Sequence, residues 1–280
     1  MKRLFLNRRF PQICTFQFTI YNFQFRFMRV RFIHRHHGES EMTQTKRDLY
    51  IKKIFSTVAP HLDFLTSLFS LGLCRLWRRK AVSLARLRPG DRVLDSCTGT
   101  GDFILALMKE LGPGGRITGI DFCPEMIRIA EQKVRKAPAN PHPRKVSFTV
   151  ADAKALPFND GTFDLVTVGF GMRNIPDTGA ALNEIQRVLK PGGRFVCLEL
   201  TRPEKQWFLP LYKSYVFRIM PFIGRMVVKK ATPYVYLPRS IEAFYPPDRF
   251  VQVIRECGFT DVNAHPMTLG VATVFTAVKA

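Results

Sequence analysis

The chain has 280 residues, of which 46% are hydrophobic, so it is long enough for one α/β domain with a full apolar core. Its 43 Lys and Arg against 22 Asp and Glu give a net charge of +21, which favours a polyanionic partner such as an anionic membrane face or a nucleic acid. No window of about 18 uncharged apolar residues occurs, so the sequence predicts no transmembrane helix.

Residues 1–41 differ from the rest in being rich in Phe and Arg. Arg26, Arg29 and Arg31 interrupt the apolar run, and no small-residue cleavage site follows, so no signal peptide is indicated. We expect a poorly ordered extension without a folded role, with Met42 as the working start. The six cysteines form no C-x-x-C pair, which predicts a reducing compartment and no metal site.

After Met42, apolar periodicity predicts helices over 46–58 and 70–87. Strands and helices then alternate with short loops, which is typical of a parallel sheet covered on both faces. The predicted strands are 92–96, 116–121, 145–152, 163–170 and 194–200, and the helices are 102–111, 124–136 and 178–190.

Residues 203–245 interrupt this alternation with many aromatic, Arg and Lys residues, and we expect a helical insertion there. A helix over 247–257 and strands over 259–267 and 270–280 complete the pattern. We therefore expect a Rossmann-like α/β domain over 42–280, with a seven-stranded, mostly parallel sheet and helices on both faces.

A glycine-containing loop, from Asp95 through Gly99 to Gly101, follows the first strand of the alternating part. Small residues let the backbone approach a ligand there, and Asp121, at the end of the next strand, is placed to hold ribose hydroxyls. Ile104 stands where a dinucleotide site has its third glycine, which argues against NAD. The alternative is a tight turn between strand and helix that has no role in ligand binding.

Asp152 and Ala153 follow the third strand of this series directly. An acidic side chain and a backbone N–H at that point can read an adenine edge. Together with the glycine loop and Asp121, the arrangement is similar to that of class I S-adenosylmethionine-dependent methyltransferases.

Several further motifs resemble the demethylmenaquinone/ubiquinone C-methyltransferase family over roughly residues 46–280. They are VLDSCTGTGD, GIDFCPEMI, VGFGMRNIPD, RVLKPGG and the distal segment from PFIGRMV to GVATVF; the F-G-M-R-N run is the most specific. The resemblance implies S-adenosyl-L-methionine as cofactor, with contacts at Thr100, Asp121, Asp152, Ala153 and Gly169. The chain departs from the family's Y-D-x-x-N pattern, because Leu62 and Thr66 replace the Tyr and Asn while Asp63 remains.

The implied reaction is methylation of a ring carbon of a polyprenylated quinol, most directly demethylmenaquinol, with a ubiquinone precursor as the alternative. Ring attack is favoured when a quinol hydroxyl loses its proton, so we expect Arg173 and Asn174 to stabilise the oxyanion. His61 or a carboxylate such as Asp63 is the candidate for taking the proton. The alternative without a catalytic role is a turn at the surface, in which Arg173 forms an exposed ion pair and Asn174 caps the next helix.

Such a substrate implies a cytoplasmic enzyme in peripheral contact with the inner, anionic membrane face, through the aromatic and basic insertion. The alternatives are a methyltransferase for another lipid or small molecule, an RNA-modifying protein, and a cofactor-binding regulator without catalysis. A methyltransferase for another lipid or small molecule would lack F-G-M-R-N. An RNA-modifying protein would carry a base-clamping motif after the fourth strand, where this chain has GFGMRNIPD, so nucleic acid is disfavoured. The sequence leaves homo-oligomerisation open.

Overall fold

The computed structural model describes residues 44–138, 145–228 and 232–280. Contacts divide the chain into Met1–Met42 and Thr43–Ala280. The expectation of a poorly ordered extension over 1–41 falls outside the described residues.

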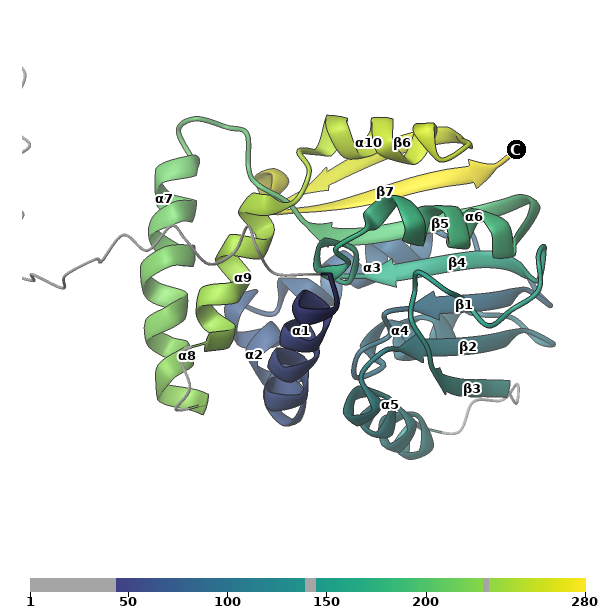
Figure 1. The fold of residues 1–280 in the computed structure, drawn as a ribbon, viewed down its shortest axis with the longest axis horizontal. Coiled ribbons are helices and arrows are strands. Elements are labelled where there is room, and N and C mark those ends of the chain that lie inside the picture. The colour runs from purple at the N-terminus through teal and green to yellow at the C-terminus, as the bar shows by residue number, and fades with distance from the viewer. Residues whose placement is uncertain (1–43, 139–144, 229–231) are drawn as a thin grey trace, which may run out of the picture. The chain divides into compact units, whose positions relative to one another are not determined.

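A seven-stranded sheet forms the centre of the described chain (Figure 1). The strands lie in the order β3-β2-β1-β4-β5-β7-β6, and only β7 of these runs antiparallel to its neighbours. Their bounds are β1 Arg92–Ser96, β2 Arg116–Asp121, β3 Lys145–Val150, β4 Phe163–Gly169, β5 Leu189–Leu200, β6 Phe259–Met267 and β7 Ala272–Lys279. The predicted seven-stranded, mostly parallel sheet is confirmed.

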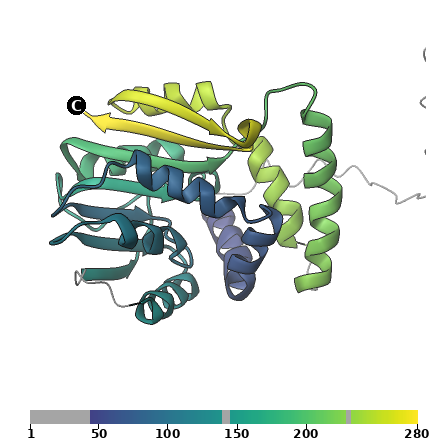
Figure 2. The ribbon, with the colours of Figure 1, turned by 180° about the vertical axis from the view of Figure 1, so that it is seen from behind.

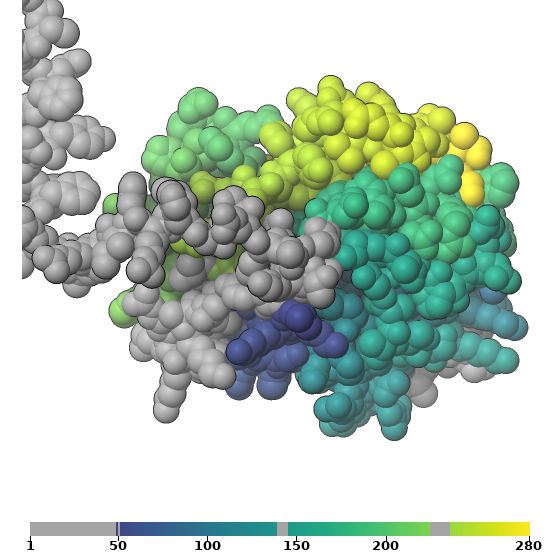
Figure 3. Space-filling model, viewed as in Figure 1, coloured from purple at the N-terminus to yellow at the C-terminus, as the bar shows by residue number. Residues whose placement is uncertain are grey.

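Helices cover both faces of this sheet, as Figures 1 and 2 show from opposite sides. Successive strand residues point to opposite faces, so Val93 packs in one apolar core and Leu94 in the other. The first core includes α3 (Leu73–Leu84) and α4 (Asp102–Glu110), and the second includes α6 (Thr178–Val188) and α10 (Pro247–Glu256). Helix α5 (Pro124–Lys136) lies against β2 and β3. In Figure 3 the segment from α10 to the C-terminus, yellow-green to yellow, forms the upper surface in this view, next to the green and teal surface of the preceding segments.

Several predicted boundaries are wrong, two of them by more than two residues at the start of an element. The helix predicted over 70–87 begins only at Leu73, because Leu71 (φ 50°) and Gly72 (φ 78°) have left-handed backbone angles that interrupt it. The strand predicted from residue 194 begins at Leu189, which pairs with Phe163 before a bulge over residues 190–193, and the helix predicted over 178–190 accordingly ends at Val188.

A group of helices gathers beyond the carboxyl ends of the parallel strands (Figure 1). Helix α1 (Gln44–Val58) leads through a 3₁₀ turn, Ala59–His61, to α2 (Leu62–Phe69), which the sequence did not predict. The predicted helical insertion is confirmed as α7 (Leu209–Ser214), a π-helical turn (Tyr215–Ile219), α8 (Met220–Val228) and α9 (Thr232–Ala243). These helices surround the space beyond the carboxyl ends of the strands.

No single helix in the described part of the chain is both long and apolar enough to cross a bilayer. One bent pair, Ile51–Phe69 with Leu73–Leu84 at 93°, meets the length and composition requirement together.

Candidate active site

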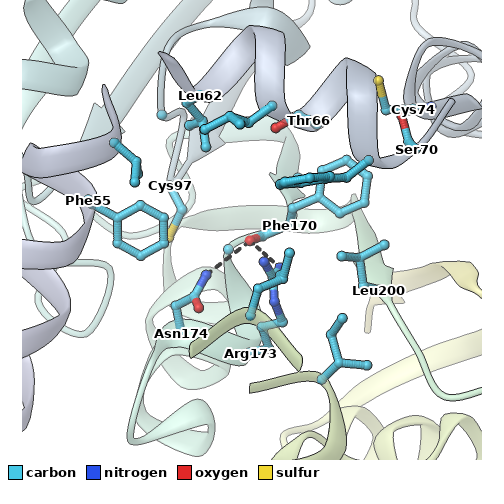
Figure 4. A pocket seen from close by; sticks show the side chains of 18 of the residues that line it. Phe55, Leu62, Thr66, Ser70, Cys74, Cys97, Phe170, Arg173, Asn174 and Leu200 are labelled. Carbon is cyan, nitrogen blue, oxygen red and sulfur yellow. Dashed lines mark hydrogen bonds between the residues drawn. The ribbon is translucent and has the colours of Figure 1, made fainter. Parts of the chain in front are cut away.

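A cavity of about 640 Å³ lies where the strand ends meet the helical cover (Figure 4). One part is lined by the loop after β1 and by the ends of β2, β3 and β4. The other part is apolar and is lined by α2, the α7–α8 segment and α9. The loop that carries Arg173 and Asn174 contributes to the wall of the same cavity. A polar nucleoside-sized ligand and an apolar ligand can therefore meet in one space.

The loop after β1 exposes its backbone to the cavity. Gly99 has a φ of 52°, which favours glycine, and no atom lies within 4 Å of where its Cβ would stand. Gly101 precedes α4 with a φ of 84°, and a Cβ there would stand 3.0 Å from the Cβ of Ala130. Glycine at position 99 therefore lets a ligand approach the backbone from the cavity, and glycine at position 101 lets α4 pack closely against Ala130.

Asp95 supports this loop from behind. It is fully buried, is not among the cavity-lining residues, and accepts hydrogen bonds from Thr98 Oγ1 (2.5 Å) and Thr167 Oγ1 (2.6 Å). Burial raises the pKa of Asp95 to about 6, in spite of the two hydroxyl donors. Its place in the structure is that of a support for the loop.

Asp121 lines the cavity at the end of β2. Its Oδ2 accepts the Gly99 N–H at 2.9 Å and its Oδ1 accepts the Cys123 N–H at 3.0 Å, so the carboxylate is fixed in orientation. Each oxygen keeps a lone pair for a further donor, as a ribose diol would supply. Burial raises the pKa of Asp121 to about 6, although the backbone donors oppose this.

The other residues expected to contact the cofactor also reach the cavity. Asp152 and Ala153 line it after β3, and the Asp152 carboxylate accepts the Lys154 N–H at 2.9 Å. Gly169 lines it at the end of β4, where a Cβ would stand 2.6 Å from the Phe103 ring. The structure thus brings Thr100, Asp121, Asp152, Ala153 and Gly169 together around one space.

A charged cluster ties α2 to this loop. Thr100 Oγ1 donates to Asp63 Oδ1 at 2.5 Å, and Lys133 Nζ contacts Asp63 Oδ2 at 2.7 Å. Lys133 also pairs with Asp102 at the start of α4, and Arg78 of α3 contacts the other Asp102 oxygen at 2.8 Å. Asp63 therefore joins the helical cover to the cofactor half of the cavity.

Arg173 lies in the 3₁₀ turn after β4, and only 8% of its side chain is exposed. Its Nη1 donates to Glu199 Oε1 and to the Phe170 carbonyl, both at 2.6 Å, and its backbone N–H donates to Glu199 Oε2 at 3.1 Å. Its Nε is buried without an acceptor among the described residues. A buried donor that lacks a partner costs free energy, and a ligand oxygen that approached the Nε–Nη2 edge of the guanidinium from the cavity would recover it.

Asn174 is held by two neighbours. Its Nδ2 donates to the Phe170 carbonyl at 3.1 Å, and its Oδ1 accepts from the Tyr236 hydroxyl of α9 at 2.9 Å. Phe170 itself has a φ of 58°, which turns its carbonyl toward both side chains. The dashed lines of Figure 4 show the two bonds to Phe170.

The interpretation of this loop as a surface corner is wrong. Arg173 is buried in an ion pair, and the cap of α6 is supplied by Asp177, whose carboxylate accepts the Ala180 N–H at 2.9 Å.

The two candidates for the base, His61 and Asp63, differ in whether they reach the cavity. His61 is exposed at the end of the 3₁₀ turn and is not among the residues that line the cavity. Asp63 does line it, as do Leu62 and Thr66, which face the Arg173 loop from α2 in Figure 4. Of the two candidates, the geometry brings only Asp63 to the site.

Sequence reasoning missed Glu199, Tyr236 and Lys133. Glu199 carried a usable signal, because it is the one acid in the apolar run RFVCLEL and a lone buried charge needs a partner. Tyr236 and Lys133 lie on helices whose packing the sequence pattern did not specify.

The apolar half of the cavity opens to solvent through an apolar rim, which we define as Leu71, Leu211 and Ile219. All three line the cavity, yet their exposed fractions are 78%, 65% and 46%. Trp207, just before α7, and Phe222, in α8, are also exposed. The basic residues Lys205, Lys213 and Arg218 of the same stretch of chain are exposed as well. Exposed apolar side chains at a cavity mouth mark an interaction site.

Comparison with known proteins identifies a matching family. The model of the ubiE/COQ5 methyltransferase family matches residues 42–279. The chain is 40% identical over 235 residues to the ubiquinone/menaquinone biosynthesis C-methyltransferase UbiE of Geotalea daltonii, covering 84% of this chain and 98% of that protein. It is 43% identical over 221 residues to the demethylmenaquinone methyltransferase of Thermus thermophilus, covering 79% of this chain and 97% of that one. A SAM-dependent methyltransferase from Aquifex aeolicus shares the fold, with a TM-score of 0.53, 20% identity and coverage of 72% and 89%.

Proposed function

The chain belongs to the ubiE/COQ5 methyltransferase family, and from that membership and the geometry of its cavity we propose that it methylates a ring carbon of a polyprenylated quinol. It is a methyltransferase that uses S-adenosyl-L-methionine, and its pathway is menaquinone or ubiquinone biosynthesis. Conversion of demethylmenaquinol to menaquinol is the most direct assignment. The UbiE relative, named for both quinones, keeps a ubiquinone precursor as the alternative.

The residues present fit the cofactor. Gly99 leaves open space beside its backbone, Asp121 offers two oriented oxygens for a ribose diol, and Asp152 with Ala153 borders the place for an adenine edge. When bound there, S-adenosyl-L-methionine supplies an electrophilic methyl group on a sulfonium.

The observation that carries the reaction is the buried Arg173, which lines the cavity and whose Nε has no acceptor among the described residues. A quinol oxygen that becomes anionic pushes electron density onto the neighbouring ring carbon, which then attacks the methyl group as the bond between methyl and sulfur breaks. The methylated ring carbon then loses its hydrogen as a proton, which restores the aromatic ring. A buried guanidinium donor stabilises that oxygen most when it is ionised. Asp63, rather than His61, is our candidate for receiving the hydroxyl proton, directly or through water.

This chemistry predicts that only the reduced ring is a substrate, because a quinone has no hydroxyl to ionise. The purified protein should methylate demethylmenaquinol kept reduced by dithionite and leave the oxidised ring unmethylated. Mass spectrometry of the product should place the added methyl on ring carbon rather than oxygen. Equal methylation of both redox forms, or an O-methyl product, would contradict the proposed role of the oxyanion.

The apolar half of the cavity supports a prenylated substrate. Side chains of α7, the π-helical turn, α8 and α9 line it, and the apolar rim opens it to the surface. We propose that the rim rests in an anionic bilayer, with Lys205, Lys213 and Arg218 near the headgroups, so that the prenyl tail enters without crossing water.

Membrane docking can be tested by vesicle flotation. The unaltered protein is expected to float with vesicles of anionic lipid and much less with neutral ones. Replacing Leu211 and Ile219 by serine should weaken binding by about tenfold or more, because each leucine-sized side chain contributes up to about 1.5–3 kcal/mol on burial. Val150→Ser removes a similarly exposed residue from β3, outside the cavity, and should leave binding unchanged. No flotation of the unaltered protein with either vesicle would refute docking.

A further inference from the structure

We infer that Glu199 is a positioning residue for methyl transfer, which acts by holding Arg173 in the orientation that meets the quinol oxygen. The inference rests on the proposed function and adds a residue whose side chain does not reach the cavity. Glu199 belongs to β5, it is fully buried, and it is absent from the cavity lining.

The Glu199 carboxylate accepts two hydrogen bonds from Arg173. Oε1 accepts from Arg173 Nη1 at 2.6 Å, and Oε2 accepts from the Arg173 backbone N–H at 3.1 Å. Oε1 also accepts the Leu200 N–H at 2.8 Å, which fixes the carboxylate to its own strand. One rigid acid therefore sets the position of both the backbone and the side chain of Arg173.

The remaining neighbours leave one edge of the guanidinium for a ligand. Nη1 has two hydrogens, and Glu199 and the Phe170 carbonyl accept them. Nε has no acceptor among the described residues. The side of Arg173 that faces Glu199 is thus hydrogen-bonded, and the edge formed by Nε and Nη2, which has no acceptor among the described residues, is left for the substrate oxygen.

The pairing also changes the electrostatics of the site. An arginine that is 8% exposed would be expelled toward water or would perturb the fold if its charge had no partner. Glu199, itself 0% exposed, compensates that charge, so the site presents a directed donor from a neutral pair. Stabilisation of the oxyanion then depends on hydrogen-bond direction, which is sensitive to small displacements.

The test is the variant Glu199→Gln, which keeps the shape of the side chain. Its amide must turn an N–H₂ group toward one of the two Arg173 donors, so the guanidinium or the turn shifts. We expect kcat to fall by about 10- to 100-fold, as displacements of about 1 Å can cost, while KM for the quinol and the Kd for S-adenosyl-L-methionine change less than about threefold.

Thr273→Val is the matched control. Thr273 is the cross-strand partner of Glu199 in β7, is fully buried, and bonds the Thr201 hydroxyl at 2.8 Å. Its replacement disturbs the same part of the sheet without touching Arg173, so kcat should stay within about twofold of the unaltered enzyme. A similar fall of kcat in this variant would show that the Glu199 effect is general destabilisation.

A double variant shows whether Glu199 acts through Arg173. In an Arg173→Met background, adding Glu199→Gln should change kcat by less than about threefold, because the group being positioned is already gone. Full additivity of the two losses, or a kcat of Glu199→Gln equal to that of the unaltered enzyme, would overturn the inference. If the unaltered enzyme transfers no methyl group to any quinol, the proposed function itself is wrong. If the unaltered enzyme is active and Glu199→Gln has the same kcat, only the positioning role of Glu199 is wrong.

Discussion

Replacing Arg173 by alanine is expected to lower kcat for quinol methylation by about 10²- to 10³-fold, the range seen when one oxyanion donor is removed. The loss should appear in turnover because the Nε hydrogen bond strengthens as the quinol oxygen gains charge. The Kd for S-adenosyl-L-methionine, measured by calorimetry, should stay near that of the unaltered enzyme, since Asp121, Asp152 and Ala153 are untouched. Unchanged turnover in the purified variant would remove Arg173 from the chemistry.

Loss of stability must be separated from loss of chemistry in this experiment. Arg173→Ala leaves the Glu199 carboxylate buried without its cation, which is expected to cost about 3–5 kcal/mol of folding free energy. The double variant Arg173→Met with Glu199→Gln removes both charges and should recover most of the melting temperature. It should remain as slow in methyl transfer as the single variant. Recovery of turnover together with stability would assign Arg173 a structural role only.

Asp121→Asn is expected to weaken S-adenosyl-L-methionine binding by about 10- to 100-fold, or roughly 1.4–2.8 kcal/mol. The carboxylate now accepts the Gly99 and Cys123 N–H groups and keeps lone pairs for a ribose diol. An amide in its place presents N–H₂ to one of those donors and loses an acceptor. Calorimetric Kd is the measurement, and kcat at saturating cofactor should change little.

Asp164→Asn is the control for that variant. Its Oδ2 accepts the Arg92 N–H at 2.9 Å, and it lies at the opposite ends of the strands, outside the cavity lining. It should leave the Kd unchanged. An equal loss of affinity in both variants would assign the Asp121 effect to the sheet rather than to cofactor contact.

Because the pKa of Asp121 is raised to about 6, we expect the affinity for the cofactor to decrease as the pH falls through that value. Above that pH the carboxylate is ionised and accepts the ribose hydroxyls, so affinity is fully present. As pH falls through about 6 the group is protonated, loses accepting capacity, and affinity declines. Asp95, whose pKa burial also raises to about 6, titrates behind the loop, so we expect Asp121→Asn to weaken this pH dependence without abolishing it.

The cofactor half of the site was predictable because it is local. Gly99 and Gly101 follow one strand and Asp121 and Asp152 follow two others, and in a parallel sheet the carboxyl ends of neighbouring strands share one edge. The order of these residues along the chain, together with the assignment of the strands, therefore predicts that they lie near one another. The same reasoning predicted Arg173 and Asn174 at that edge, after β4.

The substrate half was not predictable in this way. Tyr236 reaches Asn174 from α9, and Asp63 reaches Thr100 from α2, a helix that the sequence pattern did not reveal. Their positions depend on how an irregular helical cover packs over the strand ends, which local periodicity does not specify. The expected Tyr of the family pattern is Leu62 here, yet a tyrosine hydroxyl still lies at Asn174, supplied by Tyr236.

The structure also refines the part that Arg173 plays. The sequence presented it as a fixed positive charge at the end of an apolar strand. Its pairing with buried Glu199 makes it half of a neutral pair, and the Nε–Nη2 edge of its guanidinium has no acceptor among the described residues. The chemistry we propose accordingly depends on the direction of a hydrogen bond more than on net charge.

The most direct test of the proposed function is methyl transfer by the purified protein from methyl-labelled S-adenosyl-L-methionine to two reduced rings, demethylmenaquinol and the ubiquinone precursor quinol. We predict stoichiometric label on a ring carbon of demethylmenaquinol, at a rate that is strongly reduced in the Arg173→Met, Glu199→Gln double variant. Transfer to the ubiquinone precursor alone would move the assignment to that branch. Absence of label on either ring, with cofactor binding intact, would contradict quinol C-methylation.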